Sequence, residues 1–309
     1  MVEPHATTQK SPAEELGINS GEYPFAPNYA EVGGHRLHYV ERGAGPTVLM
    51  VHGNPSWSFY YRNLVRRLEE DHRAIAVDHI GCGLSDRPPE TDYDYTLEQR
   101  VQDLGHFIDE VIGDEPLTLV MHDWGGMIGM AWAVQNPQKV ERLVLMNTAA
   151  FHLPDTKRLP FSLWLARNTG VGALLVEKFN AFNRGATRFC VTETMPPDVV
   201  HGYRAPYEGS KEDRVATLRF VQDIPLKPDD QGYDLVSDTQ NALDVFADHP
   251  IFIGWGQKDF VFDDHFLQRW KEIYPDAEYA IYPDAGHFVL EDREEELGER
   301  IATFLKATS

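Results

Sequence analysis

Short apolar runs alternate along this chain with stretches whose apolar residues recur at helical spacing. The runs are rich in Val, Leu and Ile, as expected for strands that are covered on both faces of a sheet. They predict strands over residues 28–32, 37–41, 47–52, 74–78, 117–122, 143–147, 251–255 and 277–282. Helical spacing predicts helices over residues 59–69, 97–111, 126–135, 266–274 and 291–305. This alternation is typical of an α/β fold with a mostly parallel eight-stranded sheet flanked by helices.

One long segment, residues 152–235, interrupts the alternation. Its pattern is helical and aromatic, and prolines stand near both of its ends: Pro154, Pro160, Pro225 and Pro228. A helical insertion between two strands of one sheet is typical of a lid, although its aromatic residues also suit a small core of its own. We therefore expect a main domain formed by residues 23–151 and 236–309, a helical cap at 152–235, and a flexible N-terminal arm at 1–22.

The composition excludes several classes of function. The 309 residues carry a formal net charge of −21, whose field disfavours nucleic acid and anionic membranes as partners. Two cysteines can form at most one disulfide within the chain, too few to stabilise a fold of 309 residues. The polar start of the chain shows no secretory leader. No apolar run approaches the length of a membrane span. We expect a cytoplasmic protein without stable membrane insertion.

The sequence shows no motif for a metal or a nucleotide. The 13 histidines include no H-E-x-x-H pair and no Cys/His cluster. The glycines of "DHIGCGLSDRP" follow neither of the common phosphate-binding patterns. We therefore expect chemistry carried by side chains alone, with no metal and no cofactor. The sequence leaves a homo-oligomer open.

The stretch "LTLVMHDWGGMIGMAWA" places a carboxylate where a predicted strand meets a predicted helix. Asp123 follows the apolar run, Gly125 and Gly126 follow after Trp124, and Gly129 allows the helix to approach the sheet. Small residues at such a junction are typical of a nucleophile elbow, although Met121 stands where the usual pattern has glycine. An aspartate here predicts a carboxylate nucleophile that is ionised at neutral pH. The alternative is an N-cap of the helix.

A carboxylate nucleophile leaves an ester on the enzyme, and release of that ester needs a base and an acidic group that orients the base. In a fold with a nucleophile elbow, the three groups follow in the order nucleophile, acid, histidine. Asp259 in "IFIGWGQKDF" and His287 in "AIYPDAGHFVLED" supply this order, each after a predicted strand. Three weaker candidates for the acid stand further from a strand end or beside the histidine: Asp263, Asp264 and Asp284.

The loop "HGNPSWSFYYR" follows the predicted strand 47–52 and supplies a second group of candidate residues. The backbone N–H groups of Asn54 and Trp124 together predict an oxyanion hole. The Asn54 amide and the Trp124 indole N–H are also neutral donors beside Asp123, which suits a departing anion of modest charge density such as a halide. The alternative is a turn asparagine and a core tryptophan.

Five motifs together resemble the haloalkane dehalogenases of the α/β-hydrolase superfamily: "HGNPSW", "DHIGCGLSD", "HDWGGMIG", "WGQKD" and "DAGHF". The resemblance extends over nearly the whole chain beyond the N-terminal arm. It implies an α/β-hydrolase fold with Asp123 as nucleophile, His287 as base and Asp259 as acid. It also implies that Asn54 and Trp124 hold a halide, as in the third dehalogenase subgroup.

Three segments of the predicted cap are similar to a second family, the β-lactone decarboxylases of long-chain olefin biosynthesis: "NTAAFHLP", "RLPFSLWLARNTGVGALLV" and "TLRFVQDIPL". The predicted triad does not separate the two families, because both reactions need a carboxylate nucleophile. We expect haloalkane dehalogenation, in which a small apolar substrate yields an alcohol, a halide ion and a proton. The alternative is decarboxylation of a cis-3,4-dialkyl β-lactone to a long-chain olefin and CO2.

Two further functions are weaker candidates. Epoxide hydrolases share "HDWGG" and need lid tyrosines, for which Tyr203, Tyr207 and Tyr233 are available, but Asn54 favours the halide. Some members of the superfamily bind ligands without catalysis. Such a receptor would be expected to have a damaged triad, whereas Asp123, Asp259 and His287 are all present.

Overall fold

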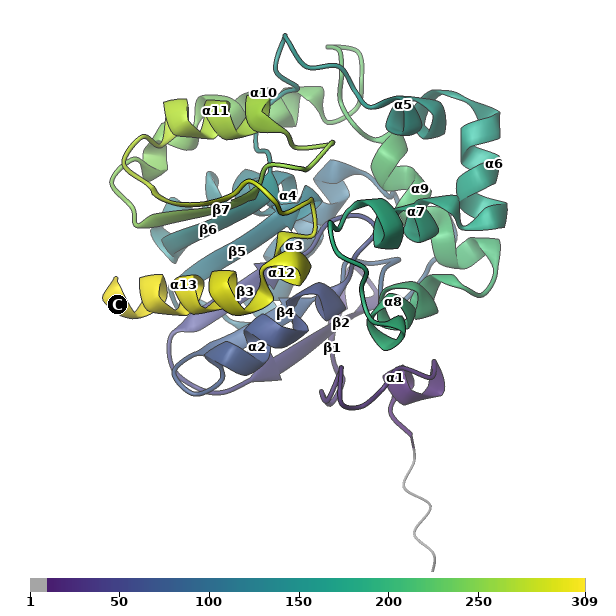
Figure 1. Cartoon of the computed structure of the whole chain (residues 1–309), viewed down its shortest axis with the longest axis horizontal. Helices are drawn as coiled ribbons and strands as arrows, with labels where there is room; N and C mark the ends of the chain where they lie inside the picture. The colour runs from purple at the N-terminus through teal and green to yellow at the C-terminus, as the bar shows by residue number, and fades with distance from the viewer. Residues whose placement is uncertain (1–9, 309) are drawn as a thin grey trace, which may run out of the picture.

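A computed structural model describes residues 10–308, in which eight strands form one sheet with helices on both faces (Figure 1). The strands lie in the order β1-β2-β4-β3-β5-β6-β7-β8. β2 pairs antiparallel with β1 and with β4, and every other neighbouring pair is parallel. The expected α/β fold with a mostly parallel eight-stranded sheet is confirmed.

The strands are short, and the central ones are buried along their whole length. Their bounds are β1 Asn28–Val32, β2 His35–Arg42, β3 Thr47–Val51, β4 Arg73–Val77, β5 Leu117–Asp123, β6 Val140–Thr148, β7 Ile251–Gly256 and β8 Glu278–Tyr282. All eight expected strands are present. Successive residues of β3 show why the strands read as continuous apolar runs: Leu49 packs in one apolar cluster and Met50 in the other.

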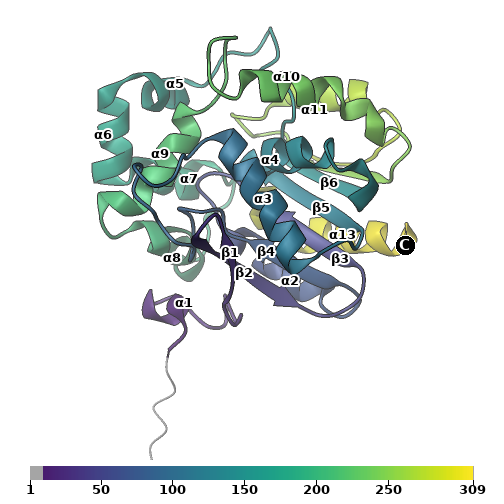
Figure 2. The same cartoon turned by 180° about the vertical axis from the view of Figure 1, so that it is seen from behind.

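Helices cover the two faces of the sheet. One face packs against α3 (Leu97–Val111), α4 (Trp124–Ala133) and α11 (Asp264–Ile273). The other packs against α2 (Arg62–Leu68) and α13 (Glu294–Ala307), which lie in front of the sheet in Figure 1 and behind it in Figure 2. Three short helices complete these layers: η1 Ser58–Tyr61, η2 Pro137–Lys139 and α12 Val289–Asp292.

The chain leaves the sheet after β6 and returns to it at β7 through a helical insertion. Its elements are α5 Phe161–Asn168, α6 Gly170–Phe179, α7 Ala181–Phe189, α8 Pro197–Arg204, η3 Ala205–Tyr207, η4 Lys211–Arg214, α9 Val215–Gln222, α10 Tyr233–Asn241 and η5 Leu243–Phe246. Helices α5 to α9 gather at one end of the sheet (Figures 1 and 2). Leu163, Val176 and Val221 belong to a small apolar core of their own. The expected cap boundary at residue 235 falls inside α10.

The N-terminal region differs from the flexible arm expected over residues 1–22. Residues 1–9 of that arm lie outside the described residues. From there on, Ser11 caps the short helix α1 (Pro12–Glu15), and Ala13 and Ile18 are buried in the same apolar cluster as Met50. The His201 ring bonds the Leu16 carbonyl at 3.0 Å. Burial of these two apolar side chains, together with hydrogen bonds such as that from Asn19 to Asp198, holds this stretch against the fold.

Candidate active site

Asp123 stands at the tip of the sharp turn between β5 and α4, at the carboxyl end of a central parallel strand. Its backbone has φ 52° and ψ −127°, a strained conformation for a residue with a side chain. The hydroxyl of Thr148, at the end of the neighbouring strand β6, donates to the Asp123 carbonyl at 2.5 Å. A Cβ on Gly125 would lie 1.9 Å from the Val51 carbonyl oxygen, so only glycine allows strand and helix to approach this closely. This geometry is that of a nucleophile elbow.

The two oxygens of the Asp123 carboxylate have different surroundings. Oδ1 accepts the backbone N–H of Asn54 at 2.6 Å, whereas Oδ2 lies 3.5 Å from Nε2 of His287. A Cβ on Gly53 would lie 2.1 Å from Oδ1, so glycine is required for this approach. Burial raises the pKa of Asp123, and His287 together with the backbone N–H groups of Trp124 and Asn54 opposes that rise. One oxygen is therefore held by a backbone N–H, and the other faces His287.

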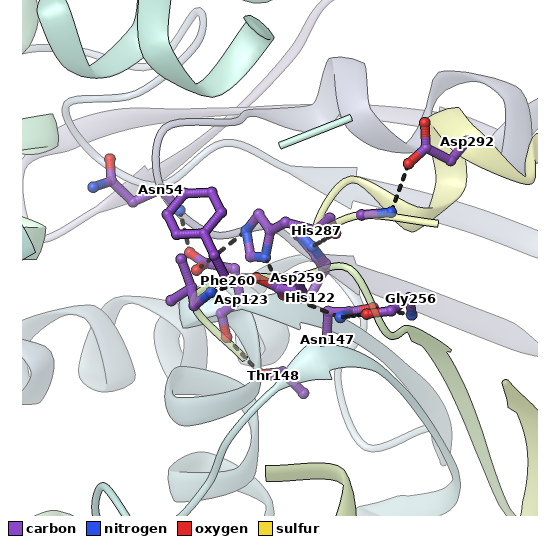
Figure 3. A network of polar contacts seen from close by, with 12 residues as sticks. Asn54, His122, Asp123, Asn147, Thr148, Gly256, Asp259, Phe260, His287 and Asp292 are labelled. Carbon is purple, nitrogen blue, oxygen red and sulfur yellow. Dashed lines mark hydrogen bonds and ion pairs between the residues drawn. The ribbon is translucent and has the colours of Figure 1, made fainter. Parts of the chain in front are cut away.

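His287 lies between Asp123 and Asp259 (Figure 3). Its Nδ1 is 2.7 Å from Asp259 Oδ2. Burial by itself lowers the pKa of His287, but the Asp259 and Asp123 carboxylates raise it above its ordinary value. Asp259 follows β7 and His287 follows β8, so the three residues come from the carboxyl ends of three strands. The structure thus brings together the three residues that the sequence predicts as nucleophile, acid and base.

The weaker candidates for the acid lie elsewhere. Asp263 caps α11 and forms an ion pair with Lys157 at 2.6 Å. Asp264 accepts a hydrogen bond from Gln257 at the surface. Asp284, although close to His287 in sequence, pairs with Arg293 on the outside of the molecule.

Asn54 and Trp124 both line the cavity beside Asp123. The Asn54 amide nitrogen donates to the Thr217 carbonyl of α9 at 3.1 Å, and Figure 3 shows this side chain pointing away from His287. An amide nitrogen carries two N–H groups, so this bond leaves one for a ligand. The Trp124 ring packs against Phe220 with centroids 5.4 Å apart. Asn54 therefore also joins the inserted helices to the turn that holds Asp123.

A cavity of about 360 Å³ lies above Asp123 and His287. Its walls are mainly apolar and come from both the main fold and the inserted helices. They include Leu153 after β6, Phe182 and Phe189 of α7, Val236 of α10 and Phe262 after β7. None of the three tyrosines weighed for epoxide chemistry is among the described residues that line it. Tyr203 bonds Glu291, Tyr207 bonds Ser56 and Tyr233 stacks on His152.

Two supporting residues escaped the sequence analysis. Asn147, at the end of β6, donates to Asp259 Oδ2 at 3.0 Å and exchanges two further hydrogen bonds with the Gly256 backbone. His122 bonds the His287 carbonyl at 2.9 Å and stacks on Tyr60. Burial holds the pKa of His122 well below its usual value, so this ring is a neutral support and not a second base. The sequence signal for Asn147 was its position at the end of a predicted strand, because the carboxyl ends of parallel strands meet at one edge of the sheet.

The remaining expectations concern metals and membranes. Within residues 10–308, no group of three or more His, Cys, Asp and Glu side chains is arranged to hold a metal ion. In the same part of the chain, no helix is both long and apolar enough to cross a bilayer.

Comparison with known proteins identifies relatives over nearly the whole chain. The profile described as alpha/beta hydrolase fold matches residues 46–294. A cis-3-alkyl-4-alkyloxetan-2-one decarboxylase of Shewanella oneidensis is 50% identical, with 92% of this chain and 90% of that protein covered. The protein of the same name from Xanthomonas campestris is 44% identical, with 92% and 97% covered. Haloalkane dehalogenase 2 of Mycobacterium tuberculosis is 30% identical, with 90% and 94% covered.

Solved structures give the same fold. The haloalkane dehalogenase DatA from Agrobacterium tumefaciens matches with a TM-score of 0.82 at 24% identity, covering 94% of this chain and 100% of that one. The haloalkane dehalogenase DbeA from Bradyrhizobium elkani matches with a TM-score of 0.82 at 25% identity, covering 92% and 98%.

Proposed function

Because the chain belongs to the α/β-hydrolase fold family, we propose that it is an enzyme whose Asp123 attacks a small apolar substrate, and that this substrate is a cis-3,4-dialkyl β-lactone. The reaction yields an olefin and CO2. One observation carries the choice of substrate: the 50% identity to the Shewanella oneidensis decarboxylase, against 30% to the Mycobacterium tuberculosis dehalogenase. This reverses the order that the motifs alone suggest.

The first step is a displacement at carbon. Asp123 Oδ2 attacks C4 of the lactone, the alkyl-bearing ring carbon bonded to the ring oxygen. The bond between C4 and the ring oxygen breaks. The electron pair stays on the oxygen, so the ring opens to a carboxylate on the neighbouring carbon. The substrate is then joined to Asp123 as an ester. Oδ1 becomes the ester carbonyl oxygen and keeps the Asn54 N–H bond seen at 2.6 Å.

The second step releases both products without water. The bond between the neighbouring carbon and the new carboxylate breaks, and its electron pair forms the C=C bond. The ester C–O bond breaks at the same time, returning its electron pair to Asp123 while CO2 leaves. The raised pKa of His287, which the Asp259 carboxylate supports against the cost of burial, favours a proton on Nε2. Nε2 lies 3.5 Å from Asp123 Oδ2, so a proton there stabilises the charge that returns to this carboxylate.

The cavity supports a substrate with two apolar arms. Its wall contains Val236 of α10 and Phe182 of α7, two helices that stand well apart in both Figure 1 and Figure 2. Asp123 and His287 open into the same space. A substrate with one short chain would leave much of this apolar wall uncovered, whereas alkyl groups on two neighbouring ring carbons can extend in both directions.

Haloalkane dehalogenation is the second candidate, and the donors beside Asp123 favour it. Trp124 and Asn54 both line the cavity beside Asp123, so the Trp124 indole N–H and the remaining amide N–H of Asn54 are the candidate donors to a departing halide. His287 would then act as a base that activates water against the ester, yielding alcohol, halide and a proton. Epoxide hydrolysis has less support, because Tyr203, Tyr207 and Tyr233 all lie outside the cavity lining.

A side-by-side assay separates these reactions. Purified protein receives a cis-3,4-dialkyl β-lactone, a 1-bromoalkane or an epoxide, and olefin, CO2, halide and alcohol or diol are measured. We expect olefin and CO2 in equal amounts from the lactone, at a rate well above halide release. Faster halide release from the bromoalkane, with no olefin from the lactone, would contradict the proposed decarboxylation and support haloalkane dehalogenation.

Two variants test the nucleophile. Asp123→Asn keeps the shape and the Oδ1 acceptor but removes the attacking charge, so turnover should fall by about a thousandfold or more. The matched control is Asp284→Asn, which removes a surface carboxylate close to His287 in sequence. It should retain parental activity. Equal losses in both variants would contradict the assignment of Asp123.

A further inference from the structure

The inserted helices expose an unusual amount of apolar surface. Among the described residues, eleven large apolar side chains are exposed, and seven of them lie between residues 161 and 189. Phe161 and Trp164 of α5 stack on each other with ring centroids 5.9 Å apart, and Phe161 is 73% exposed. Scattered exposed apolar residues are normal, but such a concentration marks an interaction surface.

Helix α6 carries most of this surface on one side. Val171, Leu174, Leu175 and Phe179 are exposed, and their spacing of three and four residues puts them on one face. The rest of the helix circumference turns inward: Gly172 and Val176 are buried beside this face, and Ala173 is half-buried. The helix lies at the outer edge of the molecule in both views, right in Figure 1 and left in Figure 2. Here we call the exposed apolar side chains of α5, α6 and α7 the lid face.

The chain segment that carries the lid face has a net charge opposite in sign to that of the rest of the chain, although Lys157 and Arg167 of this segment pair with Asp263 and Asp230 outside it. Residues 156–190 contain six basic side chains and one acidic one, a net charge of +5. The remainder of the chain holds 22 basic and 48 acidic residues, a net charge of −26. Four of the six basic residues of the segment are exposed: Arg158, Lys178, Arg184 and Arg188. The lid face is thus apolar with a basic surround.

The cavity opens toward the same helices. Ser162 of α5 and Phe189 of α7 both line the cavity and are exposed, Phe189 to 68%. Phe260, in the loop after β7, also lines the cavity and is exposed. The cavity lining therefore reaches the molecular surface at the lid face and at Phe260.

We propose that the lid face docks on the surface of an anionic phospholipid bilayer. Exposed Phe, Trp and Leu side chains partition into the headgroup boundary, and Lys and Arg around them are attracted to anionic lipid. The acidic remainder of the molecule is repelled by the same surface, which is why the net charge of −21 disfavours an anionic membrane as a partner of the chain taken as a whole. Because this repulsion is screened beyond a Debye length while the lid face lies at the lipid, the field orients the lid face toward the bilayer. A second copy of the chain suits this face less well, because a symmetric dimer would set two basic surrounds against each other.

This docking is peripheral and requires no spanning helix. It also stands apart from the reaction, since its evidence is the surface alone. If the substrate is the dialkyl lactone of the proposed function, docking lets the substrate and the olefin move between bilayer and cavity without crossing water.

Vesicle flotation with the full chain tests the proposal. The protein is mixed with phosphatidylcholine vesicles, with phosphatidylcholine–phosphatidylglycerol vesicles, or with no lipid. We expect flotation with the anionic vesicles, less with the neutral ones, and a decline as NaCl is added. On vesicles with brominated acyl chains, tryptophan fluorescence should be quenched, and Trp164→Phe should lose most of that quenching.

Paired variants distinguish vesicle binding through the lid face from nonspecific vesicle binding. Val171→Ser with Leu174→Ser removes part of the apolar face, and Arg184→Glu with Arg188→Glu reverses two of the surrounding charges. Each pair should weaken vesicle affinity by about tenfold or more. The matched controls are Val245→Ser, an exposed apolar residue of η5 outside the lid face, and Arg269→Glu on α11. Both should bind like the parent.

Melting temperatures and activity on detergent-dispersed substrate should stay at parental values in all these variants, which separates docking from folding and from the reaction. The proposal is overturned if the parent fails to float with anionic vesicles, or if the lid-face pairs float as it does. A concentration-dependent dimer that the Val171→Ser and Leu174→Ser pair converts to monomer would also overturn it, and would assign the face to a second copy.

Discussion

At the scale of single residues, Asn147 shows how a group outside the reacting atoms sets their geometry. Its amide bonds Asp259 and both backbone groups of Gly256, and its own backbone has a positive φ of 34°. Asn147→Ala should lower the free energy of unfolding by about 1–3 kcal/mol and reduce kcat with little change in KM. Denaturant titration and steady-state kinetics measure both effects.

Asn147→Gly is the informative partner of that variant. It loses the same hydrogen bonds but adopts a positive φ without strain. It should therefore be more stable than Asn147→Ala by about 1 kcal/mol. Equal stability of the two would show that the backbone conformation of residue 147 costs nothing.

The His287 imidazole supplies a prediction about pH. Despite its burial, the Asp259 and Asp123 carboxylates raise its pKa. A histidine whose pKa is raised in the folded state stabilises the fold at pH values below its unfolded pKa, and this contribution is lost as pH rises through the folded pKa. In an NMR titration, the His287 ring should titrate above the ordinary value of about 6.5, and Asp259→Asn should move that midpoint down. An unchanged midpoint would contradict the coupling.

The three catalytic candidates could be placed from sequence because each follows a recognisable strand in a fixed order. Carboxyl ends of parallel strands meet at one edge, so order along the chain becomes proximity in space. The bond between the Asn54 amide and Thr217 could not be foreseen in this way. It joins residues 163 positions apart, and it depends on how the inserted helices pack on the main fold.

At the scale of elements, the junction of β5 and α4 is the most constrained part of the fold. Gly125→Ala would force a Cβ to 1.9 Å from the Val51 carbonyl, and the backbone there cannot yield easily. We expect the free energy of unfolding to fall by about 3 kcal/mol or more. Gly185→Ala in α7 is the control, since nothing lies within 4 Å of its added Cβ. It should be neutral, or stabilising by up to about 1 kcal/mol.

Strands were easier to predict than helices because burial on both faces gives each strand a short, continuous apolar signature. Every expected strand is present, whereas the single helix expected at 291–305 is divided into α12 and α13. Helix α6 shows what helical periodicity alone cannot predict. Its apolar stripe has the spacing of a core-facing helix, yet that stripe is exposed. Periodicity reports which residues share a face, and packing by other parts of the chain decides what the face meets.

At the scale of the whole molecule, the net charge of −21 opposes compactness. Raising NaCl from about 0.01 M to about 0.15 M shortens the Debye length from about 30 Å to about 8 Å. The melting temperature should therefore rise, by about 2–4 °C for each kcal/mol of repulsion that is screened. Sucrose at matched osmolality controls for exclusion effects. A melting temperature that falls with NaCl would show that favourable ion pairs outweigh the repulsion.

The helical insertion leaves the sheet after β6 and rejoins it at β7, which are neighbouring parallel strands. Asp123, Asp259 and His287 all stand outside this stretch, on strand ends whose register does not depend on it. Replacements, deletions or duplications within one continuous piece of the gene can thus remodel the chamber wall while the reactive carboxylate stays where it is. Related proteins with this architecture can therefore evolve a different cavity wall through changes in one continuous segment, while the positions equivalent to Asp123, Asp259 and His287 stay unchanged.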